Sequence, residues 1–181
     1  MALRAGGFEL GPGAGTLLVR TFRAGVGAAV GHDLTIVATR WRGRAEVDPS
    51  DLAACSVRVR VDVDGLEVRS GEGGAKPLTD SDKRSIEGSI RGLLAAERHP
   101  EIEFASTGVA EEGDALAVSG TLSIVGVARP VRLVCHRDGN RVRGAAEVVQ
   151  SEWGIRPYSA FFGALRVKDE VTVEFDVALS D

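Results

Sequence analysis

The chain has 181 residues, of which 44% are hydrophobic and 27% are charged. This is the length of a single domain and the composition of a globular protein, which argues against intrinsic disorder. The formal net charge of −4, without a basic stripe interleaved with aromatic residues, excludes the usual nucleic-acid-binding classes. We therefore expect one domain over residues 1–181 and no nucleic-acid partner.

The first residues of the chain, its hydropathy and its cysteines bear on the cellular compartment. Residues 1–10 include Arg4 but no apolar run of the kind found in secretory signals. No segment approaches the roughly 20 apolar residues that a transmembrane helix needs. We expect a cytoplasmic protein without stable membrane insertion. Its two cysteines, Cys55 and Cys135, are expected to be buried free thiols, with a disulfide between them as the less favoured alternative.

Alternation of apolar and polar residues dominates the chain and predicts half-buried β-strands. The clearest run covers 55–64, where Cys55 and four valines hold the odd positions and mostly charged residues the even ones. Turn-forming residues at 48–50, 112–114 and 138–140 separate neighbouring runs. In chain order we expect strands at 16–22, 33–47, 55–64, 101–106, 116–124, 131–136, 140–149 and 171–179. Short connections between them favour an antiparallel meander.

One segment, 79–98, follows a helical period instead. Thr79 and Asp82 resemble a capping box, and Pro100 follows the far end. The apolar residues that would share one face of this amphipathic helix are Ile86, Ile90, Leu93 and Leu94. The fold prediction is mainly β, an eight-stranded antiparallel barrel with one inserted amphipathic helix, because closure removes the exposed sheet edges. The loop 70–77 is expected to lie over one end of the barrel.

A barrel of this size holds either packed side chains or one small ligand. Small inward residues favour a roomy interior. The inward positions that we expect to contact a ligand are Val57, Val59, Val61, Val63, Phe104, Leu122, Ile124, Val173 and Phe175. Trp41 is added to this set, although 34–36 and 37–41 favour opposite faces and so imply a bulge between them.

The segment 153–165 is unusually aromatic. It holds Trp153, Tyr158, Phe161 and Phe162, which are four of the nine aromatic residues in the chain. Such a segment is either a plug packed on the end of the barrel or a hydrophobic lip around a ligand entrance. In the second interpretation Arg156 would meet a polar head group. The two interpretations are compatible, because a barrel mouth is both core and entrance.

No catalytic or metal-binding motif is apparent. His32 precedes Asp33, but neighbouring strand residues point to opposite faces, so the carboxylate is badly placed to orient the ring. The histidines and cysteines lack metal-ligand spacing, and neither a phosphate-binding loop nor a nucleophile elbow occurs. We expect no enzymatic activity, no metal and no cofactor, and assign His32 a structural role or a place at a ligand rim.

Several short motifs occur along the chain in a characteristic order. They are Gly31-His32-Asp33-Leu34, the run 62–68 after the valine strand, His99-Pro100, the run 118–131, Trp153-Gly154-Ile155 and the run 167–171. In this order and spacing, roughly over 10–179, the chain resembles the YceI-like family of bacterial polyisoprenoid-binding, lipocalin-like proteins. The resemblance implies an eight-stranded barrel whose elongated interior holds an isoprenoid chain, such as a polyprenyl phosphate or a quinone.

The leading hypothesis is therefore binding and sequestration or transport of an isoprenoid or other long-chain lipid. Two alternatives stay open. One is a lipid-modifying enzyme that uses His32 as an acid or base. The other is a stress-response or interaction module whose barrel is filled by its own side chains. A homodimer is also left open.

Overall fold

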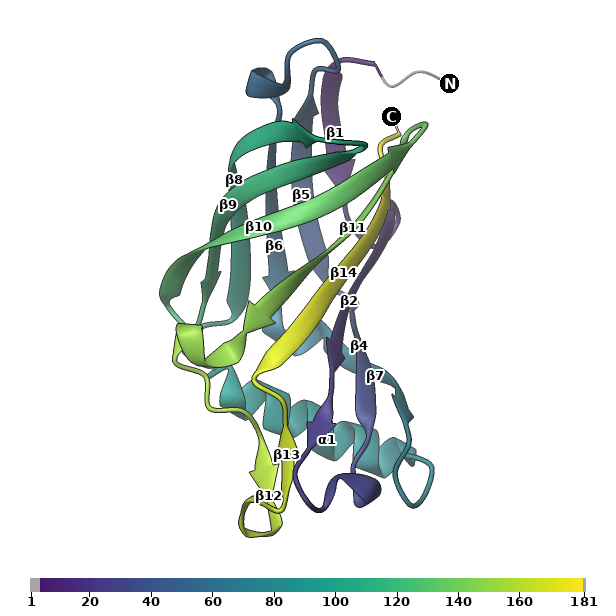
Figure 1. Ribbon diagram of the computed structural model, residues 1–181, viewed down its shortest axis with the longest axis vertical. Helices are drawn as coiled ribbons and strands as arrows, with labels where there is room; N and C mark the ends of the chain where they lie inside the picture. The colour runs from purple at the N-terminus through teal and green to yellow at the C-terminus, as the bar shows by residue number, and fades with distance from the viewer. Residues whose placement is uncertain (1–3, 181) are drawn as a thin grey trace.

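The computed structural model describes residues 4–180. It is built on an 11-stranded antiparallel sheet in the order β1-β5-β6-β8-β9-β10-β11-β14-β2-β4-β7. The sheet curls around its inner face into an elongated half-barrel (Figure 1). Its strands are β1 (Gly6–Leu10), β2 (Gly15–Thr21), β4 (Asp33–Ala38), β5 (Trp41–Val47), β6 (Ser56–Asp62), β7 (Leu66–Glu72), β8 (Glu101–Glu112), β9 (Ala115–Ile124), β10 (Val127–Asp138), β11 (Arg141–Val149) and β14 (Glu170–Ala178).

The mainly β fold with one helix agrees with the sequence prediction, whereas the count of eight strands is not confirmed. The strand expected over 33–47 is divided at Thr39 and Arg40 into β4 and β5. The strand expected over 55–64 is likewise cut short, because its chain turns at Val63–Gly65 before continuing as β7. The short strands β1 and β7 lie outside the eight expected segments, since neither shows a long alternating run.

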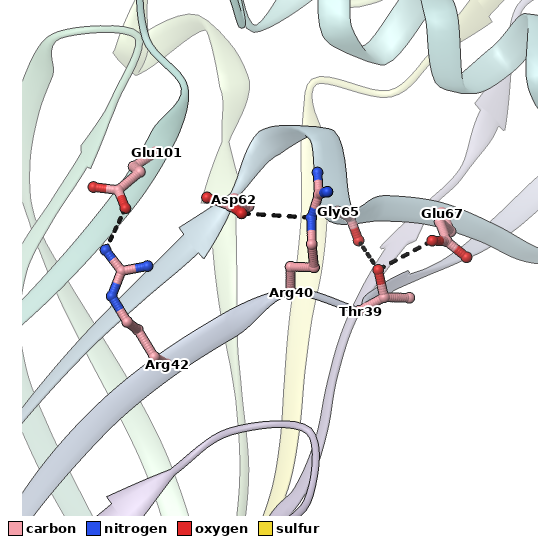
Figure 2. Close-up of polar contacts among 7 residues, drawn as sticks. All are labelled: Thr39, Arg40, Arg42, Asp62, Gly65, Glu67 and Glu101. Atoms are coloured by element: carbon pink, nitrogen blue, oxygen red, sulfur yellow. Dashed lines mark hydrogen bonds and ion pairs between the residues drawn. The ribbon is translucent and has the colours of Figure 1, made fainter.

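A polar corner connects opposite ends of the sheet order (Figure 2). Here the backbone N–H of Thr39 donates to the carbonyl of Gly65 at 2.8 Å, and that of Asp62 donates to the carbonyl of Arg40 at 3.0 Å. The Thr39 hydroxyl donates to the same Gly65 carbonyl at 2.9 Å, and the Arg40 guanidinium lies 3.4 Å from Asp62. A Cβ on Gly65 would lie 2.9 Å from the Arg40 nitrogen, so only glycine allows this close approach.

The one α-helix within residues 4–180, α1 (Asp80–Leu93), lies across one end of the sheet (Figure 1). It begins with the predicted capping box, in which Asp82 N–H donates to the Thr79 hydroxyl at 3.1 Å and Thr79 N–H donates to the Asp82 carboxylate at 2.8 Å. Glu87 accepts a 2.9 Å hydrogen bond from Val68 N–H, which docks the helix on β7. The helix ends before the predicted position 98, because Ala95 takes a left-handed φ of 48°.

A second, smaller sheet extends the same end of the molecule. It contains β12 (Ser159–Ala160), β13 (Leu165–Val167) and β3 (Arg23–Ala24), in the order β12-β13-β3. The β12–β13 hairpin projects beyond the main sheet near α1 (Figure 1). Short 3₁₀ turns complete the described chain: η1 (Ala28–Val30), η2 (Leu52–Ala54), η3 (Val63–Gly65), η4 (Gln150–Trp153) and η5 (Phe161–Gly163).

Candidate functional site

The inner face of the curled sheet and one face of α1 surround a cavity of about 740 Å³. This volume lies within the range of small-molecule binding pockets. Strand β6 shows how the wall is made: Val57, Val59 and Val61 line the cavity, whereas Arg58 and Arg60 between them are exposed. The alternation predicted from the sequence is confirmed for this strand. Strict alternation therefore gives the sheet an apolar inner face and a charged outer face.

Helix α1 supplies the wall at one end of the cavity. Its apolar lining side chains are Ile86, Ile90, Leu93 and the adjoining Leu94, the same residues whose spacing predicted an amphipathic helix. Sequence reasoning identified this apolar face but did not assign it to the site. The signal was present, because a helix inserted between strands must bury its apolar face on the sheet or over its open end.

Two glycines of the main sheet leave room for large aromatic rings on the neighbouring strands. A Cβ at Gly120 would lie 2.5 Å from the ring of Phe104, and one at Gly144 would lie 2.6 Å from the ring of Phe175. Each ring thus covers a glycine on the neighbouring strand, an arrangement known to stabilise glycine in sheets. Because the rings rest on the sheet, the cavity beside them stays open.

Most of the residues predicted for the site line this cavity. They come from the main sheet, apart from one residue that precedes β4 and one at the β12–β13 end. These residues are His32, Trp41, Val57, Val59, Val61, Phe104, Leu122, Ile124, Tyr158, Val173 and Phe175. The face changes before Trp41, but not at the predicted bulge between 34–36 and 37–41: Leu34, Ile36 and Ala38 line the cavity at even positions, and Trp41 does so only after the corner at Thr39 and Arg40.

The structure corrects the positions of Val63 and Trp153. Val63 is buried in the turn η3, where the chain leaves the strand and the alternation ends, so its side chain is not part of the cavity wall. Trp153 is 2% exposed and packs against Ile124 and Val148, which line the cavity, without lining it itself. Its indole N–H donates to the carbonyl of Leu122 at 2.9 Å. Of the two interpretations of this aromatic segment, the packed plug is the one that describes Trp153.

The predicted lip residues Arg156, Phe161 and Phe162 also lie outside the cavity wall. Phe161 and Phe162 form the turn η5, where both rings are exposed, because the hairpin projects away from the sheet. Arg156 lines a separate depression together with Arg166 and Lys168. Only Tyr158 of the expected lip reaches the cavity itself.

His32 anchors the loop that follows β7. Its Nε2 lies 2.7 Å from the carbonyl oxygen of Lys76, so this nitrogen carries the hydrogen and donates it. The neighbouring Asp33 carboxylate faces elsewhere: it accepts from the backbone N–H of Arg23 at 2.8 Å and lies 3.9 Å from the Arg23 guanidinium. As expected from alternation, Asp33 does not orient the His32 ring, and the two residues do not form a catalytic dyad.

Both cysteines are free, as predicted, but only Cys135 is fully buried. Cys135 lines the cavity and its thiol contacts the carbonyl oxygen of Leu116 at 3.5 Å. Burial raises the pKa of the Cys135 thiol, because desolvation disfavours the thiolate. A nucleophilic thiolate is therefore scarce at neutral pH.

We expect the two thiols to react at different rates with a maleimide at neutral pH. Cys55 is half-buried and should react first, whereas buried, protonated Cys135 should react at least about tenfold more slowly. Mass spectrometry of timed samples measures both rates, and the denatured, non-reduced protein should take up two labels. Equal rates would contradict the protected position of Cys135, and no labelling would contradict the free thiols.

Residues 4–180 contain neither a cluster of metal ligands nor a membrane-spanning helix. No group of three or more His, Cys, Asp or Glu side chains there is arranged to hold a metal ion. No helix of that described part is long and apolar enough to cross a membrane.

Fold and cavity together define a β-barrel-like protein built around one large apolar interior. The family model described as "YceI-like domain" matches residues 20–179. The chain therefore belongs to the YceI-like family. Among curated protein sequences no significant match is found.

Solved structures with this fold are similar in shape but distant in sequence. BcnA of Burkholderia cenocepacia superimposes with a TM-score of 0.66 at 17% identity, covering 91% of this chain and 96% of that one. A YceI protein of Campylobacter jejuni, crystallised with large solvent channels, gives a TM-score of 0.58 at 12% identity, covering 78% of this chain and 81% of that one. At such identities the likeness establishes the fold.

Proposed function

We propose that the protein binds an isoprenoid or other long-chain lipid inside the cavity, and sequesters or transports it. The observation that carries this proposal is the apolar interior of about 740 Å³, which is large enough for a ligand and offers it few polar partners in its middle. Membership of the YceI-like family supports the same ligand class, since the family is known for binding polyisoprenoids.

Burial of the lipid chain would supply the affinity. Each methylene removed from water contributes about 0.8 kcal/mol, so ten of them contribute about 8 kcal/mol before the cost of association is subtracted. The valines of β6 provide such contacts along one wall. This source of affinity depends on chain length and shape, which suits a carrier of isoprenoid chains.

Polar residues at the ends of the cavity would orient the lipid. The end of the cavity near α1 is lined by Arg23, His32 and Arg166. The other end of the cavity, where β5, β8 and β10 end, is lined by Glu46, Glu111 and Arg137. An anionic head group fits the α1 end best, because two arginines lie there. We place the head group at this end and the chain along the valine wall.

Binding without chemical conversion is part of the proposal. His32 is held by the Lys76 carbonyl and Asp33 by Arg23, while burial keeps the Cys135 thiol protonated. These are the groups nearest to acid–base or nucleophilic chemistry, and each has another partner or the wrong protonation state. The two free thiols support a reducing compartment, and we propose the cytoplasm.

Native mass spectrometry of the purified protein tests the proposal. We expect an adduct of one lipid per chain, which organic extraction releases as an unmodified isoprenoid or long-chain molecule. Incubating delipidated protein with that extract should restore the adduct and raise the melting temperature. A chain that carries no lipid and gains no stability from it would favour the filled-barrel module. Conversion of the added lipid would favour the enzyme.

A further inference from the structure

Large exposed hydrophobic side chains gather at one end of the molecule. Within residues 4–180 all of them fall in two segments, 22–32 and 153–168: Val26, Val30, Tyr158, Phe161 and Phe162. Phe161 is 69% exposed and Phe162 113% exposed. Single exposed hydrophobic residues are ordinary, but their confinement to one place marks an interaction surface. We call these two segments the apolar tip.

The apolar tip is a defined structural unit. Strand β3 pairs with β13, and Gly27 N–H donates to the Ala164 carbonyl at 2.8 Å, so the two segments are held together. Phe161 and Phe162 have φ angles of 51° and 55°, a left-handed conformation that bulky residues rarely adopt. This turn holds both rings outside the sheet, where they have no apolar cover of their own.

The charge of the apolar tip is opposite to that of the whole protein. The segments contain Arg23, Arg156, Arg166 and Lys168 and no Asp or Glu, in a chain of net charge −4. Of the carboxylates beside the segments, Asp33 binds Arg23, and Asp169 accepts from the N–H and hydroxyl of Ser151 at 2.7 and 2.5 Å. Glu152 and Glu170 also border the segments, and Glu147 and Glu170 line the same depression as Arg156, Arg166 and Lys168. Exposed cations beside exposed phenylalanines match an anionic lipid surface.

We propose that the apolar tip docks on the surface of an anionic lipid bilayer. Phe161 and Phe162 enter the boundary between head groups and acyl chains, while Arg156, Arg166 and Lys168 meet the anionic head groups. Val30, Tyr158 and Arg166 belong both to the apolar tip and to the cavity wall, so the docked face is continuous with the cavity. The contact is peripheral and reversible. It goes beyond lipid binding in the cavity and does not depend on which ligand the cavity takes.

Vesicle co-sedimentation tests docking. We expect the protein to sediment with vesicles of phosphatidylcholine and phosphatidylglycerol in equal parts, to bind vesicles of phosphatidylcholine alone much more weakly, and to dissociate at high salt. Phe161→Asn with Phe162→Asn should weaken binding at least about tenfold, since both rings lose their apolar contact. Asparagine tolerates the left-handed backbone, so the fold should be kept. Thermal melts check this.

A charge comparison separates docking from general attraction. Arg156→Gln with Lys168→Gln should weaken binding to the anionic vesicles by about fivefold per charge removed. Arg4→Gln with Arg58→Gln removes the same charge from exposed positions outside the apolar tip and should change binding far less. A Phe162→Trp variant adds a second readout, because its fluorescence should shift to shorter wavelength when vesicles are added.

Three results would overturn the proposal. The first is no sedimentation with anionic vesicles, and the second is equal sedimentation of the wild type and the asparagine variant. The third is a concentration-dependent dimer that the asparagine variant dissociates, in the absence of vesicle binding, which would make the apolar tip an interface between two copies. Native mass spectrometry of the cavity ligand is a separate measurement, so failure of docking and failure of lipid binding are distinguishable.

Discussion

Val61→Asp is expected to abolish lipid retention and to lower the free energy of unfolding by about 3 kcal/mol or more. Val61 is buried, lines the cavity and packs in the core cluster with Trp41 and Leu66. An aspartate there is desolvated without a partner or draws water into the apolar interior. Urea denaturation measures the stability, and native mass spectrometry measures the retained lipid.

The matched control is Arg58→Asp, three positions away on the outer face of β6. This change places the same carboxylate in solvent and should alter stability by about 0.5 kcal/mol or less. Lipid retention should be unchanged. If both aspartate variants retain lipid equally, the inner face of β6 does not contact the ligand.

Val59→Trp keeps the test decisive should Val61→Asp fail to fold. Tryptophan at this half-buried cavity position fills space without adding charge, and it should displace a long chain. Melting temperature and far-UV circular dichroism identify a folded variant. The cavity hypothesis is falsified if folded Val59→Trp retains the same extractable lipid at the same stoichiometry.

Alternation made the sheet predictable and also limited what could be predicted. The run at 55–64 gave the correct face for Val57, Val59 and Val61, because a half-buried strand repeats every two residues. It failed at Val63, where a turn begins without a glycine or proline at that position. Asp64-Gly65 is a local turn signal that the strand prediction over 55–64 did not take into account, whereas the approach of Gly65 to Arg40 from a distant part of the fold is shown by no local pattern.

The candidate site was predictable where residues belong to regular elements. The spacing of the apolar residues of α1 predicted that they share one face, and this face lines the cavity. Their part in the wall could not be predicted, because it depends on where the helix lies in the fold. The aromatic segment was ambiguous because composition alone does not separate a buried ring from an exposed one. The structure divides it, burying Trp153 and exposing Phe162. Phe162 is exposed because it lies in a left-handed turn of the projecting hairpin, and the residue types alone do not predict this turn.

Trp153→Ala should destabilise the protein by about 3–5 kcal/mol, because it removes a fully buried indole and leaves a cavity behind the wall. Trp153→Phe should cost about 1–2 kcal/mol, chiefly through loss of the hydrogen bond to the Leu122 carbonyl. Since the Trp153 side chain lies behind the wall, folded Trp153→Phe should keep the lipid stoichiometry of the wild type, in contrast to Val59→Trp. Chemical denaturation and native mass spectrometry on the same samples check both halves. Loss of lipid from Trp153→Phe at unchanged stability would mean that the indole contacts the ligand directly.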